Sequence, residues 1–281
     1  MPWQILTFIS VITLSVSILL QRMLLHKDKS DPIAYVVIFQ GLVAIIIASY
    51  AILHGFHVPD FKAYWFPILV TILLYSAGHI AYAKTLQQVE ASVFSVFFAT
   101  NAIWVMLAGI IVFHEHLNIG QLLGALFIFA SVSLLAEHAG LLKMERSIIL
   151  GLLTGLLFGL ATIGWTYVGR HADAASWSAF SFGGPSLVVL LSNPSSLRKM
   201  RPFMSGSTFL RILVLGVLFS VSAVTLLLAY QKANVSLVAP SQQSSIIITM
   251  LLAVIFLHER THLWRKICAS LLCFIGVLLI V

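Results

Sequence analysis

The sequence has little charge. Only 9% of its 281 residues are Asp, Glu, Lys or Arg, while 60% are hydrophobic. A soluble globular domain carries roughly 25% charged residues. The composition therefore excludes an ordinary water-soluble domain. It fits a chain with repeated apolar runs of about 20 residues, the length that crosses a bilayer core.

Other features are also scarce or missing. The two cysteines, Cys268 and Cys273, lie five residues apart in the last apolar run and would point in different directions around a helix. We expect buried thiols there, not metal ligands. The sequence has no phosphate-binding G-x-x-x-x-G-K-[ST], which argues against an ATP-driven pump. The net charge of +7 collects at the ends of the apolar runs, which favours contact with lipid headgroups and not with nucleic acid.

The apolar runs are continuous and do not alternate, so they favour helices over membrane strands. The sixth run contains Gly151, Gly155 and Gly159, a spacing that lets another helix approach closely. In the seventh run we expect an interruption at Gly183-Gly184-Pro185. We expect ten spans at about residues 2–20, 33–53, 64–86, 91–113, 119–135, 148–169, 174–191, 209–230, 235–257 and 263–281.

One segment occurs twice. Residues 81–115 and 229–259 share several identical positions: Tyr82 and Tyr230, Lys84 and Lys232, Ser92 and Ser236, Met106 and Met250, Ile111 and Ile255, and His114-Glu115 and His258-Glu259. A repeat at half the chain length indicates two copies of one unit. Because each copy has an odd number of spans, the second enters the membrane upside down. The sequence thus predicts an all-α integral membrane protein of ten helices, with a five-helix repeat at 1–140 and its inverted copy at 141–281.

The basic residues are distributed unevenly. Loops after odd-numbered spans hold 13 Lys and Arg residues, and loops after even-numbered spans hold 3. Cytoplasmic loops carry the excess of basic residues. The count therefore predicts that both termini lie outside the cell.

The sequence His258-Glu259-Arg260-Thr261-His262 matches H-E-x-x-H, the zinc motif of metalloproteases. No acidic third ligand follows it, and the copy at His114-Glu115 has no second histidine at the required spacing. A membrane-embedded zinc protease is therefore the weaker alternative. We expect no enzyme activity, no metal and no cofactor.

A polar patch interrupts the ninth span. Five consecutive polar residues in hydrocarbon cannot all be hidden by packing, so some must face water or a solute. His79 is the one ionisable side chain deep inside a span, which makes it a functional candidate and the group to which proton coupling would fall. The expected cavity residues are Gln21, Tyr75, His79, Thr100, Asn101, Trp165, Ser241, Gln242, Gln243 and Ser245. Phe97 or Trp104 would cover the apolar part of the solute, and Gln40 and Tyr167 are further candidates.

The ten spans and the duplicated segments, KANVSLVAPSQQSSIIITMLLAVIFLHE and EASVFSVFFATNAIWVMLAGIIVFHE, resemble the ten-helix EamA-type branch of the drug/metabolite transporter superfamily. His114 and His258 stand where this family usually has glycine. The resemblance implies both termini inside, opposite to the charge count. It also implies a secondary transporter that works by alternating access.

We expect an exporter of a small neutral or zwitterionic metabolite, such as an amino acid, in the plasma membrane (the inner membrane of a bacterium). A multidrug or amphiphile exporter of the same fold is the alternative. A monomer and a homodimer both remain open, as does a membrane scaffold that transports nothing.

Overall fold

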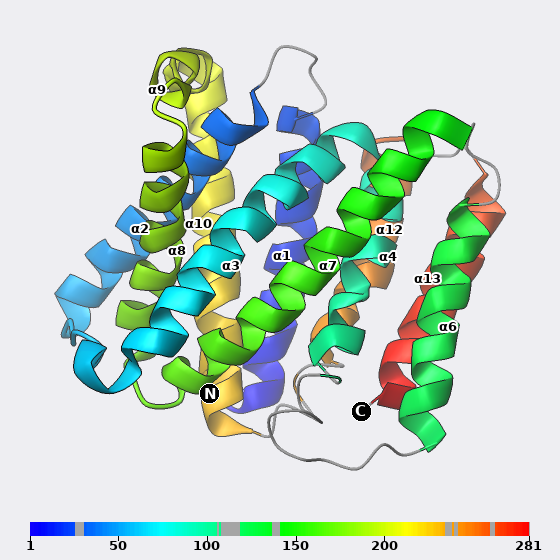
Figure 1. Ribbon diagram of the computed structural model, residues 1–281, viewed down its shortest axis with the longest axis horizontal. Helices are drawn as coiled ribbons and strands as arrows, with labels where there is room; N and C mark the ends of the chain where they lie inside the picture. The colour runs from blue at the N-terminus through cyan, green and yellow to red at the C-terminus, as the bar shows by residue number, and fades with distance from the viewer. Residues whose placement is uncertain are drawn as a thin grey trace.

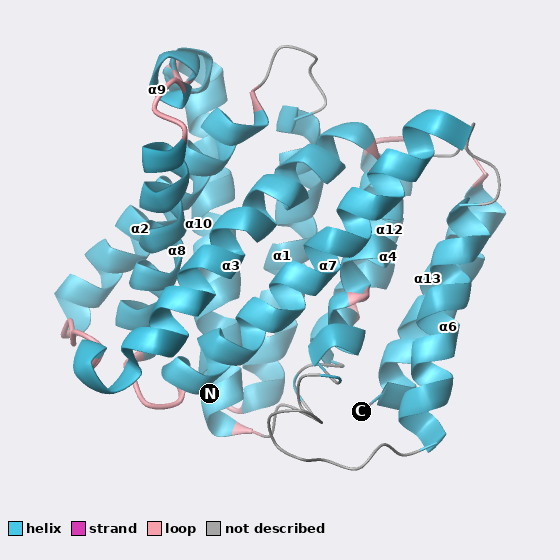
Figure 2. Cartoon of the chain, viewed as in Figure 1, coloured by secondary structure: helices cyan, strands magenta, loops and turns pink. Residues whose placement is uncertain are grey.

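The computed structural model describes residues 1–25, 31–105, 107, 119–136, 141–233, 238, 241–258 and 262–280. This part of the chain is almost entirely helical and has no strand (Figure 2). The all-α prediction is confirmed. By length and composition, six helices of the described part are long and apolar enough to cross a membrane, and shorter apolar helices accompany them.

Eight helices cover predicted spans, while α4 and α12 are shorter than the spans predicted at 91–113 and 235–257, parts of which lie outside the described residues. The first half contains α1 (Trp3–Leu25), α2 (Pro32–His54), α3 (Phe61–Gln88), α4 (Ala91–Ala99) and α6 (Ile119–Ala136). The second half contains α7 (Leu141–Gly169), α8 (Ala174–Ser192), α10 (Gly206–Lys232), α12 (Ser245–Phe256) and α13 (Leu263–Ile280). A short helix α9 (Ser196–Lys199) and a 3₁₀ turn η1 (Arg201–Met204) lie in the loop between α8 and α10.

Three of the helices begin at an aspartate. Asp31, Asp60 and Asp173 each accept hydrogen bonds from backbone N–H groups in the first turn of α2, α3 and α8. Such caps satisfy donors that have no partner inside the helix. These acids therefore end the polar loops and fix where each apolar span starts.

The helices pack as two copies related by a pseudo-twofold axis. α2 contacts α8, α4 contacts α12, and α6 contacts α13, so each of these helices meets its own counterpart in the other half. The remaining major contacts also form equivalent pairs, because α1 packs on α10 as α7 packs on α3. In Figure 1, α1 rises from the side where α13 ends, while α7 runs the opposite way. The inverted repeat is thus a property of the packing as well as of the sequence.

The predicted interruption of the seventh span is wrong. α8 continues through Gly183 and Gly184 with Pro185 inside it. Gly184 serves close packing instead, since a Cβ there would lie 2.7 Å from Ile72 of α3. Nearby, Ser186 donates a hydrogen bond to the Val37 carbonyl of α2 at 2.9 Å.

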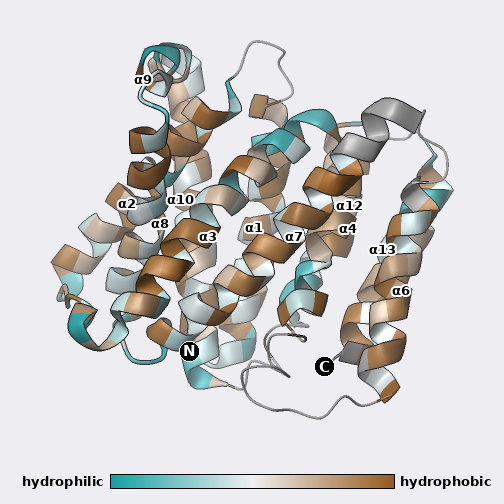
Figure 3. Ribbon diagram, in the orientation of Figure 1, coloured by the Kyte–Doolittle hydropathy of each residue, from teal (hydrophilic) through white to brown (hydrophobic). Residues whose placement is uncertain are grey.

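The outer faces of the helices are apolar (Figure 3). Large side chains such as Phe8, Trp65 and Leu126 are more than half exposed, as expected for side chains that meet lipid. Large side chains such as Tyr35, Phe94 and Trp177 are fully buried between helices.

Candidate functional site

Two helix breaks lie at equivalent positions of the repeats. Thr100 N–H donates to the Phe97 carbonyl, and Ser244 N–H donates to the Ser241 carbonyl, both at 3.2 Å and both across three residues. The φ and ψ angles are −59° and −16° at Thr100, and −56° and −20° at Ser244. In the repeat alignment Thr100 corresponds to Ser244. A tight 3₁₀ turn inside a span often marks a functional hinge or site.

A hydrogen bond joins the two repeats beside these breaks. The Gln243 amide nitrogen donates to the Asn101 Oδ1 at 3.2 Å. Both side chains are half-buried. The sequence predicted that these amides from opposite halves would line one cavity, and the structure places them in contact.

The neighbouring Gln242 is only 7% exposed. Within the described residues, neither its amide oxygen nor its amide nitrogen has a hydrogen-bond partner. A buried amide without partners costs free energy, so such a group calls for water or a bound molecule. Gln242 is therefore the member of the patch that is best prepared to accept a solute.

The other members of the patch have structural partners. The Thr100 hydroxyl donates back to the Phe97 carbonyl at 2.7 Å and so belongs to the turn itself. The Ser245 carbonyl accepts from the Ser15 hydroxyl of α1 at 3.3 Å. The Ser241 carbonyl is used by the 3₁₀ turn. The polar atoms named here take part in the turn or in a contact with α1, so they stabilise the break and are less available to a solute.

The glycine face of α7 holds α4 in place. A Cβ on Gly155 would lie 2.1 Å from the Thr100 hydroxyl, and one on Gly159 would lie 2.9 Å from the Asn101 carbonyl. The spacing predicted close approach of a neighbouring helix, and that neighbour is α4 of the same chain. The glycines therefore allow the chain at the helix break to pack closely against α7.

A second polar group is centred on His79 of α3. Its Nδ1 lies 2.9 Å from the Gln40 amide nitrogen of α2. His79 Nε2 and Gln40 Oε1 have no partner among the described residues, and both side chains are at least 95% buried. Tyr75, one helical turn away, lies with its ring centroid 5.8 Å from that of His79.

Phe158 of α7 packs against the polar group around His79 and against α4. Its ring centroid lies 5.4 Å from Tyr75, 4.9 Å from His79, 5.9 Å from Tyr82 and 5.2 Å from Phe98 of α4. Both Phe158 and Phe98 are half-buried. No sequence pattern singled out Phe158, because phenylalanine is common in apolar spans.

The two rings predicted to cover the solute differ in their burial. Phe97 is fully buried, and its ring lies 2.6 Å from a Cβ built on Gly151, so it packs between α4 and α7. Trp104 is half-buried, and its own Cβ lies 2.6 Å from a Cβ built on Gly159. Phe98 and Phe158 are half-buried as well.

Two further predicted residues lie apart from the Asn101–Gln243 contact. Trp165 donates its indole N–H to Ser181 at 3.1 Å, so its polar atom is used between α7 and α8. Gln21 is 1% exposed, and its side chain is a hydrogen-bond partner of the Tyr82 hydroxyl. The buried hydroxyl of Tyr35 has no partner in the described part of the chain, and the sequence did not single out Tyr35 or Tyr82 as a site residue.

The zinc-protease geometry is not formed. α12 ends at Phe256 and α13 begins at Leu263, and His258 and His262 both have positive φ, at 54° and 50°. The two histidines therefore do not share one helix face, which the motif requires. Glu259 lies outside the described residues.

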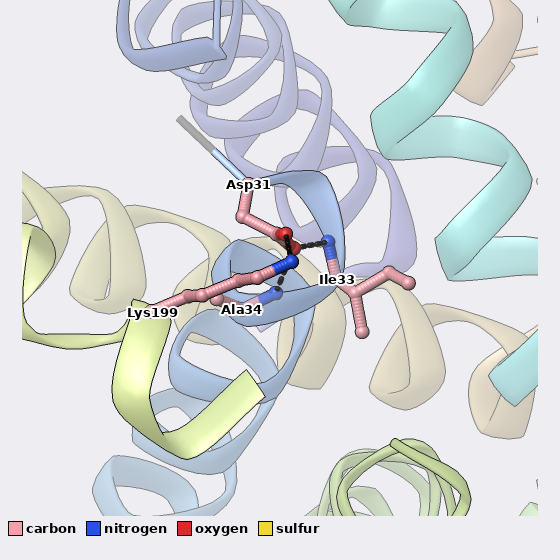
Figure 4. Close-up of polar contacts among 4 residues, drawn as sticks. All are labelled: Asp31, Ile33, Ala34 and Lys199. Carbon is pink, nitrogen blue, oxygen red and sulfur yellow. Dashed lines mark hydrogen bonds and ion pairs between the residues drawn. The ribbon is translucent and has the colours of Figure 1, made fainter. Parts of the chain in front are cut away.

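Ion pairs join the two halves at the face that carries the loops after odd-numbered spans, which hold most of the basic residues; we call it the basic face. Lys199 of α9 donates to Asp31 at 2.7 Å, as Figure 4 shows together with the cap contacts of Asp31 to Ile33 and Ala34. Partial burial opposes ionisation of Asp31, but the hydrogen bonds from Lys199 and Ala34 outweigh it and lower its pKa. Lys266 of α13 pairs with Glu90, which precedes α4. Both pairs connect the first repeat to the second.

Comparison with known proteins agrees with this architecture. The family model described as the EamA-like transporter family matches residues 1–136 and 145–281. A solved structure titled only "Crystal structure of protein" is similar to this chain with a TM-score of 0.70 and 13% sequence identity, over 99% of this chain and 95% of that one. At this identity the likeness concerns the fold alone. No curated protein matches the chain.

Proposed function

Because this chain belongs to the EamA-like transporter family, and so is a membrane transporter of the drug/metabolite superfamily, we propose that it exports a small neutral or zwitterionic metabolite, such as an amino acid, by alternating access. The membrane is the plasma membrane. The observation that carries the proposal is the contact between Asn101 and Gln243 beside the unpartnered amide of Gln242.

The two helix breaks support this location for the binding site. Discontinuous helices at the interface of inverted repeats form the binding sites of many secondary transporters. Here both breaks belong to helices that meet each other, α4 and α12. Rocking of one repeat against the other would expose the amides alternately to the two sides of the membrane.

The chemistry of the site supports an uncharged or internally neutralised solute. Every carboxylate whose side chain the structure describes lies at a helix N-cap: Asp31, Asp60, Glu90 and Asp173. A transporter of amphiphilic cations would gain from a carboxylate within its spans. The amides of Gln242 and Asn101 instead supply neutral donors and acceptors, and Phe98 and Phe158 supply an apolar surface.

The test uses purified protein in proteoliposomes. Uptake is measured for amino acids, nucleosides and amphiphilic cations, with and without a proton gradient. We expect transport of a neutral or zwitterionic solute in the absence of ATP. Asn101→Ala and Gln242→Ala should each raise the KM about fivefold, since one lost hydrogen bond is worth about 1 kcal/mol.

Thr225→Ala is the matched control, because Thr225 is a half-buried residue whose hydroxyl donates to the Val221 and Ser222 carbonyls of its own helix. It should leave KM unchanged. Selective transport of amphiphilic cations would replace this proposal with the multidrug alternative. An unchanged KM in both amide variants would show that the patch only joins helices.

A further inference from the structure

The hydrogen bond between Gln40 and His79 has a defined direction. The Gln40 amide nitrogen lies 2.9 Å from His79 Nδ1. An amide nitrogen can only donate, so Nδ1 must accept. The remaining proton of a neutral imidazole then sits on Nε2.

The Nε2–H group of His79 can donate a hydrogen bond to a further acceptor. It is buried and has no partner among the described residues. Its ring stands edge-to-face against Phe158, at 4.9 Å and 86°, and is tilted toward Phe182 of α8 at 6.4 Å. An N–H donor in this position is available to an acceptor atom of a solute.

Gln40 also carries the group that a protonated His79 would need. Its Oε1 is buried and has no partner in the described part of the chain. Rotation of the amide by half a turn would place Oε1 against Nδ1. There it would accept a hydrogen bond from the Nδ1–H group of the imidazolium. One side chain can therefore serve both protonation states.

No described charged group competes for His79. The side chains known to face its ring are Gln40, Tyr75, Phe158 and Phe182. The other described titratable groups on helices packed against α3, and on α3 itself, are Arg22, Tyr35, Tyr50, His54, Lys62, Tyr64, Tyr82, Lys84 and Tyr167, with Asp31, Asp60, Glu90 and Asp173 at helix caps. Arg22 is held by the carbonyls of Leu86 and Gln87.

We propose that Gln40 is a positioning residue: it holds His79 as the neutral tautomer with its proton on Nε2, turned toward the solute, and its Oε1 accepts a hydrogen bond from Nδ1–H when His79 becomes charged. This rests on the proposed transport function. Any coupling of transport to protons then passes through this pair.

The first test reads the tautomer directly and needs no substrate. Purified protein is labelled with ¹⁵N in its histidine rings, and the His79 signals are identified by their loss in His79→Gln. We expect the Nε2–H tautomer in the wild type at neutral pH and a mixture of tautomers in Gln40→Met, which keeps the shape and removes the amide. An Nδ1–H tautomer in the wild type, or an unchanged tautomer in Gln40→Met, overturns the proposal.

The second test follows L-phenylalanine uptake as a function of pH. Gln40→Glu places a carboxylate against Nδ1 and favours the charged imidazole, so the midpoint of the profile should move up by about one pH unit or appear near neutrality if the wild type has none. In a His79→Gln background the same change should have no effect on the profile. An unmoved profile in Gln40→Glu contradicts the proposal. Absence of any phenylalanine transport would count against the proposed substrate class, and the tautomer measurement would still decide the role of Gln40.

Discussion

At the scale of single residues, polar atoms inside this protein divide into two kinds. Ser10 and Ser222 satisfy each other across α1 and α10, with their hydroxyls 3.0 Å apart. Gln242 and His79 instead keep buried atoms without partners in the described part of the chain. Because buried polar groups are nearly always paired, the unpaired ones are the sites to test for solute binding.

The Asp31–Lys199 pair allows a clean separation of two roles at one residue. Asp31→Asn keeps the helix cap, since Asn caps as well as Asp, but loses the ion pair. Lys199→Gln loses only the ion pair. Lys199 is 59% exposed, so each variant should lose at most about 1 kcal/mol, and the double variant should lose no more than either one.

The pH dependence of this loss follows from the lowered pKa of Asp31. A depressed carboxyl pKa contributes stability above the unfolded value of about 3.9, and that stability disappears as the pH falls through the folded value. Chemical denaturation in detergent should therefore show a difference between wild type and Lys199→Gln at neutral pH that vanishes in acid. Equal stability at neutral pH would mean that the pair contributes nothing.

At the scale of helices, the glycines of α7 allow the break after α4 to pack closely against α7. Its glycines leave room for the Thr100 turn, and Gly78 of α3 leaves room for the ring of Phe158, whose atoms lie 3.1 Å from a Cβ built there. Small residues at helix contacts are the usual means of close packing in lipid. The polar site thus depends on positions that carry no polar atoms.

Gly159→Ala should displace α4. The added Cβ would lie 2.6 Å from the Cβ of Trp104 and 2.9 Å from the Asn101 carbonyl, and neither atom can move without the helix. We expect a loss of about 1–3 kcal/mol and weaker solute binding. Gly183→Ala is the control, because its Cβ would meet only Ala44 at 3.4 Å. Thermal unfolding of both variants measures the difference, and equal melting temperatures would rule out the close contact.

At the scale of the whole molecule, the two halves are joined by contacts at different depths. The amides of Asn101 and Gln243 meet beside the helix breaks, while the Asp31–Lys199 and Glu90–Lys266 pairs close the basic face. Alternating access by rocking would have to open one of these faces at a time. The ion pairs hold the basic face together in this structure.

Orientation in the membrane is the prediction that belongs to this scale. The charge count places the basic face in the cytoplasm. In a background without Cys268 and Cys273, Leu197→Cys should resist an impermeant thiol reagent added outside the cell, while Val58→Cys should react; both positions are more than half exposed. The reverse pattern would place the termini inside, as the family resemblance implies.

The sequence by itself determined the helices and their duplication, because span length and apolar composition are local properties that the bilayer imposes on any such chain. It also pointed to Asn101, Gln243 and His79, since polar residues in an apolar span are conspicuous. Only the tertiary structure decided which polar groups stay unpaired. Phe158, Tyr35 and the partner of His79 depend on which helix faces meet. So does the close contact of Gly184 with Ile72, in a helix that continues through Gly183-Gly184-Pro185. Such contacts join residues far apart in the chain, and no local pattern records them.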